Sequence, residues 1–319
     1  MILNNYKIWS LTDGSQGMRS QANGLAMELG SDIHEIKTEL LFPWSKLQPG
    51  ILPTFNWIFR NQIPENKLPK ILISCGRKSV YLSLYLKKKF KDIINIHIQN
   101  PKISFEKFNF IIAPNHDGIK GPNVINSIGA LHQFNSENNI LTISNINLPK
   151  NNLLSCFIGG ENQHYKFSEK EINNLCNELL TTVKANPKLN LLVITSRRTN
   201  NITKRILNKK LSGIASIWTG EGENPYFFAI KYSSFFVLTS DSTSMISESA
   251  ISGKPIYVYH LPYKRISKRL QYFHNEFKNL NITRDFNNIK KLDEWKYKPL
   301  NETKRIAGII KKRIIEEDL

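Results

Sequence analysis

The stretch FFVLTSDSTSMISESAISGKPIYVYH, residues 235–260, decides the fold class. Its apolar start, 235–239, predicts a buried strand, and a run of hydroxyl side chains then opens a helix predicted over 243–252. Gly253-Lys254-Pro255 ends that helix, and a second apolar run, 255–260, predicts the next strand. Strand, helix and strand in this order form the parallel unit of α/β proteins.

The same alternation continues along the chain on both sides of this stretch. Further strands are predicted at 6–11, 33–37, 70–75, 93–99, 108–113, 153–158, 191–195 and 214–218, and further helices at 18–29, 79–90, 168–183, 200–209, 225–232 and 301–317. A polar, Asn-rich stretch at 135–152 separates two series of such units. We therefore expect an α/β protein of two Rossmann-like domains that face a cleft: an N-terminal α/β domain at 1–150, and a C-terminal one at 151–319 that carries the terminal helix.

Length and composition agree with two globular domains. The chain has 319 residues, and its hydrophobic fraction of 40% excludes intrinsic disorder. No run approaches the roughly 18 apolar residues that a transmembrane helix needs, and the N-terminus shows no signal-peptide pattern, so we expect a cytoplasmic protein. Three cysteines without metal-site spacing predict buried apolar filler.

The net charge of +18 has two explanations. A basic surface attracts nucleic acid, anionic lipid or phosphorylated substrates. A bias toward Lys, Asn and Ile, as AT-rich coding sequence gives, also produces it. The charges are spread along the chain and no nucleic-acid-binding motif accompanies them, which favours composition bias. We expect no nucleic-acid partner and leave open a peripheral contact with the inner membrane.

The hydroxyl-rich turn is the strongest candidate for a binding site. Free backbone amides at a helix N-terminus, with hydroxyls beside them, suit a diphosphate. A carboxylate one turn further in suits paired sugar hydroxyls. An ordinary N-cap explains one such residue but not an unbroken run. The candidates here are Ser240, Asp241, Ser242, Thr243, Ser244 and Glu248.

Three other turns of the second half join this candidate site. Adjacent arginines where a strand ends suit a phosphate clamp, although a solvated basic loop is the alternative. A glycine pair allows a ligand to approach the backbone, and an Asn-Pro-Tyr triplet is explained by helix capping alone. The candidates in these turns are Ser196, Arg197 and Arg198, then Gly159 and Gly160, then Asn224 and Tyr226.

Two turns of the first half resemble phosphate-binding turns. Both follow a predicted strand and precede a helix, but neither matches a dinucleotide or P-loop pattern. The candidates for binding an acceptor or a phosphate are Gly14, Gly17, Gly76 and Arg77. A solvated loop explains the cation pair Arg77 and Lys78 equally well.

A general base is expected in the first half. His116 beside Asp117 at a strand end suits the deprotonation of an acceptor hydroxyl, and a simple turn is the equal alternative. Asp13 is a less favoured candidate. No metal-ligand spacing occurs in the sequence, so we expect neither a metal nor another cofactor.

Taken together, the motifs resemble a known family. Their order along the chain is WSLTDGSQG at 9–17, CGRKS at 75–79, QNP at 99–101, PNHD at 114–117, IGG at 158–160, TSRRT at 195–199, NPY at 224–226 and TSDSTSM at 239–245. This order is similar to that of the mitochondrial-fission "elongated mitochondria" family, whose bacterial members are labelled as glycosyltransferases. The resemblance covers about residues 7–262.

The second half also resembles the donor domain of GT-B glycosyltransferases, so the resemblance implies a GT-B-like fold. By that similarity Glu248 would hold the donor ribose and Ser242 to Ser244 the pyrophosphate. The turn Asp13–Gly17 departs from the glycine- and His-containing pattern of that group, which leaves the acceptor and the base open.

The resulting hypothesis is metal-independent transfer of a sugar from a nucleotide-diphosphate sugar to a cell-envelope glycolipid acceptor of the lipopolysaccharide type. A non-enzymatic, membrane-associated adaptor of the fission type on the same fold is one alternative. A nucleotide-sugar epimerase is another.

Overall fold

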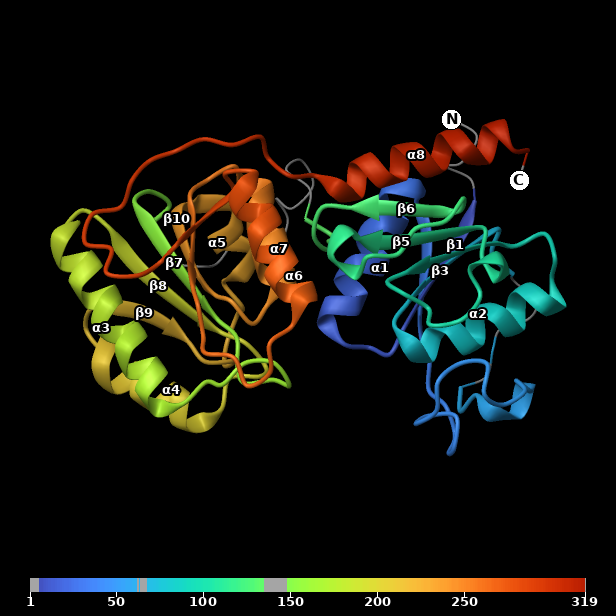
Figure 1. Ribbon diagram of the computed structural model, residues 1–319, viewed down its shortest axis with the longest axis horizontal. Helices are drawn as coiled ribbons and strands as arrows, with labels where there is room; N and C mark the ends of the chain where they lie inside the picture. Colours follow the sequence, from blue (N-terminus) through green and yellow to red (C-terminus); the bar gives the residue numbers. More distant parts are fainter. Residues whose placement is uncertain (1–5, 62, 64–67, 135–147, 319) are drawn as a thin grey trace. The chain divides into compact units, whose positions relative to one another are not determined.

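The computed structural model describes residues 6–61, 63, 68–134 and 148–318, which form two compact units (Figure 1). The first unit comprises residues 1–133 and 301–319, and the second comprises residues 134–300. Among the described residues each unit holds one sheet of six strands, and all strand pairs are parallel. Both units are therefore Rossmann-like α/β domains.

The first sheet has the strand order β2-β1-β3-β4-β5-β6. The elements of this unit are β1 (Lys7–Thr12), α1 (Gln16–Leu29), β2 (Asp32–Lys37), η2 (Asn56–Ile58), β3 (Ile71–Cys75), α2 (Arg77–Lys89), β4 (Ile94–Ile98), η3 (Phe105–Lys107), β5 (Phe110–Pro114), η4 (Asn115–Asp117), β6 (Val124–Ser127) and α8 (Glu302–Glu316).

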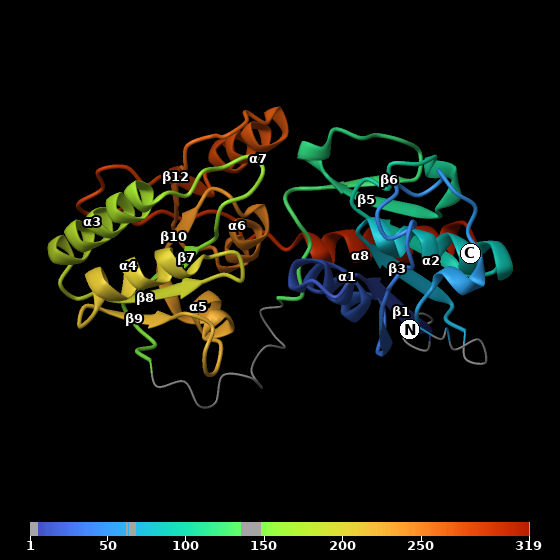
Figure 2. The same cartoon turned by 90° about the horizontal axis from the view of Figure 1, so that it is seen from below.

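Helices cover both faces of the first sheet, because successive strand residues point to opposite sides. Ile8 and Ile73 belong to a buried cluster that also contains residues of α1 and α8. The alternate positions, Trp9 and Leu72, pack with Tyr81 of α2 on the other face. Figure 2 shows α8 lying beside α1.

The second sheet has the strand order β12-β11-β10-β7-β8-β9. The elements of this unit are β7 (Leu153–Ile158), α3 (Glu169–Ala185), β8 (Asn190–Thr195), α4 (Asn201–Leu211), β9 (Ala215–Trp218), α5 (Tyr226–Tyr232), β10 (Ser233–Thr239), α6 (Thr243–Ser249), η5 (Ala250–Ser252), β11 (Ile256–Tyr259), α7 (Lys268–Asn279) and β12 (Thr283–Asp285).

Packing in the second unit follows the same alternation. Cys156 points to the face where Ile172 of α3 and Leu207 of α4 complete a buried cluster. Phe157, the next residue, packs against Tyr226 of α5 with ring centroids 4.6 Å apart. At the start of α3 the Ser168 side chain accepts a hydrogen bond from the Glu171 amide.

The predicted fold class is confirmed: two Rossmann-like domains with parallel sheets and a C-terminal helix. The assignment of that helix to the second domain is wrong. Helix α8 packs in the first unit because its apolar stripe, including Ile306, Ile310 and Ile314, completes the α1 side of the first core. The boundary predicted at residue 150 falls inside the second unit, and 135–147 lie outside the described residues. The cleft between the domains stays a prediction.

Hydrogen bonds tie the start of α8 to the loop after β6. The Ile128 amide donates to Glu302 Oε2 at 2.8 Å. Thr303 Oγ1 accepts from the His132 amide at 3.0 Å and donates to the His132 carbonyl at 2.8 Å. The helix is thus fixed by polar and apolar contacts alike.

None of the helices in the described parts of the chain is long and apolar enough to cross a bilayer.

The packing of α8 gives a first testable prediction. Ile310→Ala should lower the free energy of unfolding by about 2–4 kcal/mol, because it leaves a cavity in the first core. Ile315→Ala on the same helix is the control, since Ile315 is 62% exposed and should cost less than about 0.5 kcal/mol. Urea unfolding measures both, and equal losses would contradict the packing.

A buried histidine gives a second prediction. His97 on β4 lies with Nδ1 2.9 Å from Ser74 Oγ, and burial lowers its pKa from 6.5 to about 3. The His97 ring is therefore neutral in the folded state. Above pH 6.5 the titration of His97 has no effect on the free energy of unfolding, but as the pH falls from 6.5 toward 3 the unfolded chain binds a proton that the folded state does not, and the protein loses stability. The expected slope is about 1.4 kcal/mol per pH unit within that window.

His97→Gln should remove this part of the acid sensitivity, whatever its effect at neutral pH. Urea unfolding of both proteins between pH 7 and pH 5 measures the difference in slope. His34→Gln, on the exposed edge strand β2, controls for loss of a histidine as such. Parallel pH profiles for the native chain and His97→Gln would rule the assignment out.

Candidate functional site

The second sheet contains one point where the strand order reverses. From β7 the chain continues to β8 and β9 on one side, and it then returns to β10 on the other side of β7. Because all these strands are parallel, their carboxyl ends share one edge. Open α/β sheets bind ligands at that edge, at this topological switch point. The predicted loops after β7, β8 and β10 therefore meet there.

The Asp241 carboxylate holds these loops together. Its Oδ2 accepts a hydrogen bond from the Gly160 amide at 3.0 Å and lies 2.7 Å from Arg198 Nη2. Its Oδ1 accepts from Thr239 Oγ1 at 2.6 Å. The Asp241 side chain is fully buried, whereas the Arg198 side chain is 36% exposed. One buried charge thus orients a partly exposed guanidinium.

The glycine pair after β7 is required by this close packing. A Cβ atom on Gly159 would lie 2.1 Å from Asp241 Oδ2, and one on Gly160 would lie 2.2 Å from the Arg198 carbonyl oxygen. The Gly159 amide donates to Thr239 Oγ1 at 2.9 Å, and Arg198 Nη1 donates to the Gly160 carbonyl at 3.2 Å. Only glycine lets the three loops approach so closely.

The loop after β8 separates the two predicted arginines. Thr199 Oγ1 accepts from the Ser196 amide at 2.9 Å and lies 2.6 Å from the Gly159 carbonyl, which anchors the loop. Ser196 Oγ accepts from the Arg198 amide at 3.2 Å. Both arginines are exposed, and Arg198 pairs with Asp241. The structure therefore brings one arginine of the predicted clamp to the switch point. We call Asp241, Gly159, Gly160, Arg198 and Thr239 the Asp241 cluster.

The hydroxyl-rich turn has several structural roles. Ser240 is buried, and its Oγ accepts from the Leu261 amide at 3.0 Å. Ser242 is the N-cap of α6, where its Oγ accepts from the Met245 amide at 3.4 Å. Thr243 and Ser244 are half-buried in the first turn of that helix. The capping explanation therefore holds for Ser242, and binding by the others stays a prediction.

Glu248 lies within α6 and contacts α5. It is buried, and its Oε2 accepts a hydrogen bond from the Tyr226 hydroxyl at 2.5 Å. Burial, and then the neighbouring carboxylate, raise the pKa of Tyr226 well above its usual range, so the phenol stays a donor. Asn224 Oδ1 accepts from the Tyr226 amide at 3.0 Å, although the N-cap of α5 is Pro225 and not Asn224 as expected.

The first sheet has its own switch point between β1 and β3. The turn after β1 contains Asp13, whose Oδ1 accepts from the Ser15 amide at 2.9 Å, and Gly14, whose φ of +86° favours glycine. Gly17 follows in the first turn of α1, and Gly76 follows β3 with a φ of +87°. The two predicted glycine turns therefore flank this switch point.

Arg77 is engaged by the chain itself. Its guanidinium donates to the carbonyl oxygens of Ser45 at 2.5 Å and of Trp44 at 3.4 Å, and also to that of Leu47. These bonds fix the segment before η2 to the start of α2. A phosphate-binding role for Arg77 stays a prediction, and the geometry favours a structural one.

The predicted bases lie in two separate places. His116 and Asp117 are in η4 after β5, where His116 Nε2 is 3.9 Å from Asp117 Oδ1 and both side chains are largely buried. Asp13 follows β1. Strands β3 and β4 lie between, which corresponds to about 14 Å at the usual strand spacing. Asp13 therefore does not pair with His116.

Within the described residues, no group of three or more His, Cys, Asp or Glu side chains could hold a metal ion.

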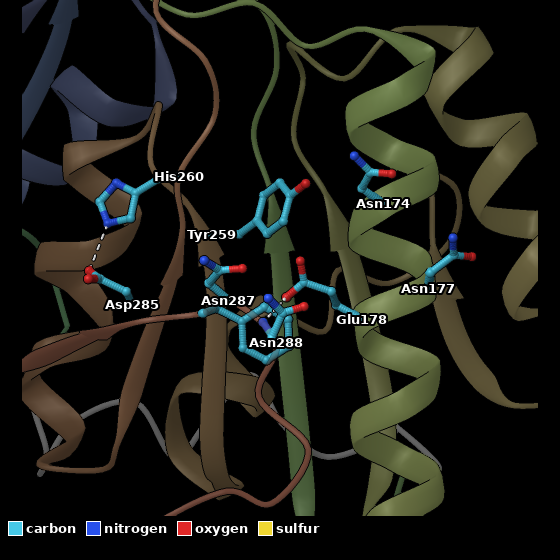
Figure 3. A pocket seen from close by; sticks show the side chains of 9 residues that line it. Asn174, Asn177, Glu178, Tyr259, His260, Asp285, Asn287 and Asn288 are labelled. Atoms are coloured by element: carbon cyan, nitrogen blue, oxygen red, sulfur yellow. Dashed lines mark hydrogen bonds and ion pairs between the residues drawn. The ribbon is translucent and has the colours of Figure 1, made fainter.

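A pocket of about 600 Å³ in the second unit was not predicted (Figure 3). His260 and Asp285, at the ends of β11 and β12, lie on one side of it, and α3 lies on the other. His260 Nε2 is 3.1 Å from Asp285 Oδ1, and Lys278 Nζ is 2.6 Å from Asp285 Oδ2. Burial lowers the pKa of His260, and Asp285 partly offsets this.

The lining of this pocket is rich in amides and carboxylates. It consists of Asn174, Asn177, Glu178, Tyr259, His260, Asp285, Phe286, Asn287 and Asn288. No predicted site residue belongs to it. The pocket therefore lies outside the Asp241 cluster, on strands β11 and β12 toward the edge of the sheet.

The Asp241 cluster gives a testable prediction. Asp241→Ala should lower the free energy of unfolding by about 2–4 kcal/mol, because it leaves an amide, a hydroxyl and a guanidinium without their acceptor. Asp285→Ala is the matched control. Its side chain is 48% exposed in a pair with Lys278, so the expected loss is below about 1 kcal/mol. Urea unfolding measures the free energy of unfolding of both variants. Similar losses in the two would show that Asp241 is not the link between the loops.

Comparison with solved structures shows the fold. UDP-GlcNAc 2-epimerase from Neisseria meningitidis, solved with UDP-GlcNAc, is 12% identical and superposes with a TM-score of 0.50 over 97% of this chain and 100% of that one. The glycosyltransferase of kitacinnamycin is 10% identical, with a TM-score of 0.52 over 97% and 99% of the two chains. The fold is therefore GT-B-like, as it is in glycosyltransferases and epimerases that use this architecture.

Two sequence relatives extend over most of the chain. An uncharacterized protein of Rickettsia prowazekii is 29% identical and covers 95% of this chain and 97% of its own length. Mitochondrial fission protein ELM1 of Arabidopsis thaliana is 25% identical over 79% of this chain and 66% of the plant protein. Residues 16–314 match the family described as Mitochondrial fission ELM1, and the chain belongs to that family.

Proposed function

We propose that the chain transfers a sugar from a nucleotide-diphosphate sugar to an envelope glycolipid acceptor of the lipopolysaccharide type, without a metal. The observation that supports this most is the meeting of three loops at the switch point of the second sheet. The proteins of similar fold include an epimerase solved with UDP-GlcNAc and a glycosyltransferase.

Arg198 is the proposed ligand of the departing diphosphate. Asp241 and the Gly160 carbonyl fix its guanidinium, and its partial exposure leaves the charge accessible to a phosphate. A positively charged group that is already oriented stabilises a leaving group without reorganisation during the reaction. The exposed Arg197 and the half-buried Thr243 and Ser244 are proposed to add contacts to the same diphosphate.

Glu248 is the proposed partner of the donor ribose. In this structure Oε2 accepts the Tyr226 hydroxyl, which holds the carboxylate in one orientation. A carboxylate so placed accepts hydrogen bonds from vicinal hydroxyls. In an inverting reaction His116 or Asp117, or Asp13 as the second choice, removes the acceptor proton. A cytoplasmic location with peripheral contact with the inner membrane belongs to the same proposal, since a glycolipid acceptor is embedded there.

One observation favours the alternative of a non-enzymatic adaptor. Arg198 and Glu248 both make hydrogen bonds or ion pairs within the protein, to Asp241 and Tyr226. A protein that kept the fold without the activity would need these contacts for stability alone. Nucleotide binding separates the two functions.

Isothermal titration with UDP, GDP, ADP and CMP tests the donor site. We expect one nucleoside diphosphate to bind, and Arg198→Gln to weaken it about 10- to 100-fold through loss of a charge-assisted contact. Glu248→Gln should weaken binding of the nucleotide but not of inorganic pyrophosphate. Arg205→Gln, an exposed arginine on α4, is the control and should bind as the native chain does.

Failure of all four nucleotides to bind would favour the adaptor, and unchanged affinity in both site variants would contradict the proposed donor site. If a nucleotide sugar is consumed, product analysis without any acceptor separates an epimerase from a transferase.

A further inference from the structure

Three aromatic side chains of the first unit are exposed together. Phe42 is 78% exposed, Trp57 60% and Phe55 45%. The rings of Phe55 and Trp57 are stacked, with centroids 5.8 Å apart and planes 8° from parallel. The Leu41 amide donates to the Ile58 carbonyl at 2.8 Å, which joins the backbone next to Phe42 to the backbone next to Trp57. We call Phe42, Phe55 and Trp57 the aromatic platform.

Buried groups hold the platform in place. Trp44 is 7% exposed, and its ring meets Trp57 edge-on at 5.0 Å. Its indole N–H donates to the Pro53 carbonyl at 2.9 Å. The Arg77 guanidinium fixes the same segment through three carbonyl oxygens, and Tyr81 adds a hydrogen bond to the Leu47 carbonyl at 3.2 Å. The exposure is therefore a property of an anchored segment, which Figure 1 shows in blue beside α2.

The charge around the platform is positive. From Leu40 to Pro64 the sequence contains no Asp or Glu, while Lys46 and Arg60 are exposed within it. The hydrogen bond and charge of Lys37, with a smaller contribution from Arg60, lower the pKa of Glu39, which precedes this segment. The whole chain carries a net charge of +18. The partner of this surface is therefore apolar at its centre and anionic around it.

We propose that the aromatic platform docks on the surface of a membrane that contains anionic lipid. The Trp57 ring enters the headgroup region, where amphipathic rings are favoured, and the apolar rings of Phe42 and Phe55 reach the boundary with the acyl chains. Lys46 and Arg60 are exposed in the same segment of the chain, and each attracts lipid phosphates through its charge. Exposed apolar rings with a basic border fit a bilayer surface in both respects.

The inference rests on the proposed function in one respect: the glycolipid acceptor of that proposal lies in a membrane, which makes a membrane the expected partner. The binding assay needs no nucleotide, so its failure and the failure of the nucleotide titration are separate results.

Co-sedimentation of the full chain with vesicles tests the proposal. Phosphatidylcholine vesicles with about one third phosphatidylglycerol should bind the protein, and vesicles of phosphatidylcholine alone should bind it far less. The double variant Phe55→Ser, Trp57→Ser should lower the partition coefficient about tenfold or more. Tyr272→Ser in the second unit, 52% exposed in the native chain, is the matched control and should bind unchanged.

A second set of variants tests the basic residues Lys46 and Arg60. Lys46→Ala and Arg60→Ala should each lower the partition coefficient about fivefold at low salt. Lys209→Ala, an exposed lysine on α4, should have a smaller effect. Trp57→Phe should still bind, but without most of the blue shift in tryptophan fluorescence that vesicles cause in the native chain. Trp9, Trp44 and Trp295 are buried, and the half-buried Trp218 lies on β9 in the second unit.

Three results would overturn the proposal. The first is equal binding to both kinds of vesicle, and the second is unchanged binding by the double variant. The third is a native dimer that the double variant abolishes while vesicles bind neither protein, which would assign the platform to a second copy of the chain. A urea unfolding curve of the double variant that matches the native curve confirms that it remains folded.

Discussion

A single buried carboxylate organises the second unit. Parallel strands place all loops of one kind on one edge, but nothing in that geometry joins the loops to each other. The Asp241 side chain does so, since it accepts hydrogen bonds from the Gly160 amide and the Thr239 hydroxyl and forms an ion pair with Arg198. Burial of a carboxylate away from water lowers the stability of the fold unless hydrogen-bond donors or a cation compensate for the lost solvation. The glycine pair, the strand-end hydroxyl and the arginine therefore depend on one another, and the geometry of the whole edge depends on all of them.

Most of the fold could be predicted because its strands are buried on both faces. Continuous apolar runs such as 153–158 and 235–239 gave strand positions to within two residues. Strands β6 and β12 were not predicted, because they have only four and three residues and carry polar side chains. Helix α7 was also not predicted, although the spacing of Leu270, Phe273 and Phe277 is helical and could have indicated it.

The candidate site could be predicted in its residue types but not in its contacts. Polar residues at strand ends identify an edge, and the strand order then shows which of them meet. Neither reveals that Asp241 faces Arg198, because their ion pair joins positions 43 residues apart in the sequence. For the same reason the sequence leaves Arg77 as either a phosphate ligand or a solvated cation and does not reveal that its guanidinium links α2 to a segment 30 residues earlier. The pocket lined by His260 and Asp285 depends on β12, which was not predicted.

The position of α8 has a consequence for how the chain acquires its structure. Residues 301–319 belong to the first unit, yet they leave the ribosome only after the whole second unit. Until then the groove formed by α1 and the first sheet lacks the side chains of Ile306, Ile310 and Ile314. Early synthesis thus yields an unfinished domain with apolar surface open to solvent, and the later domain has the opportunity to fold first. Order of synthesis and order of completion are opposite in this chain.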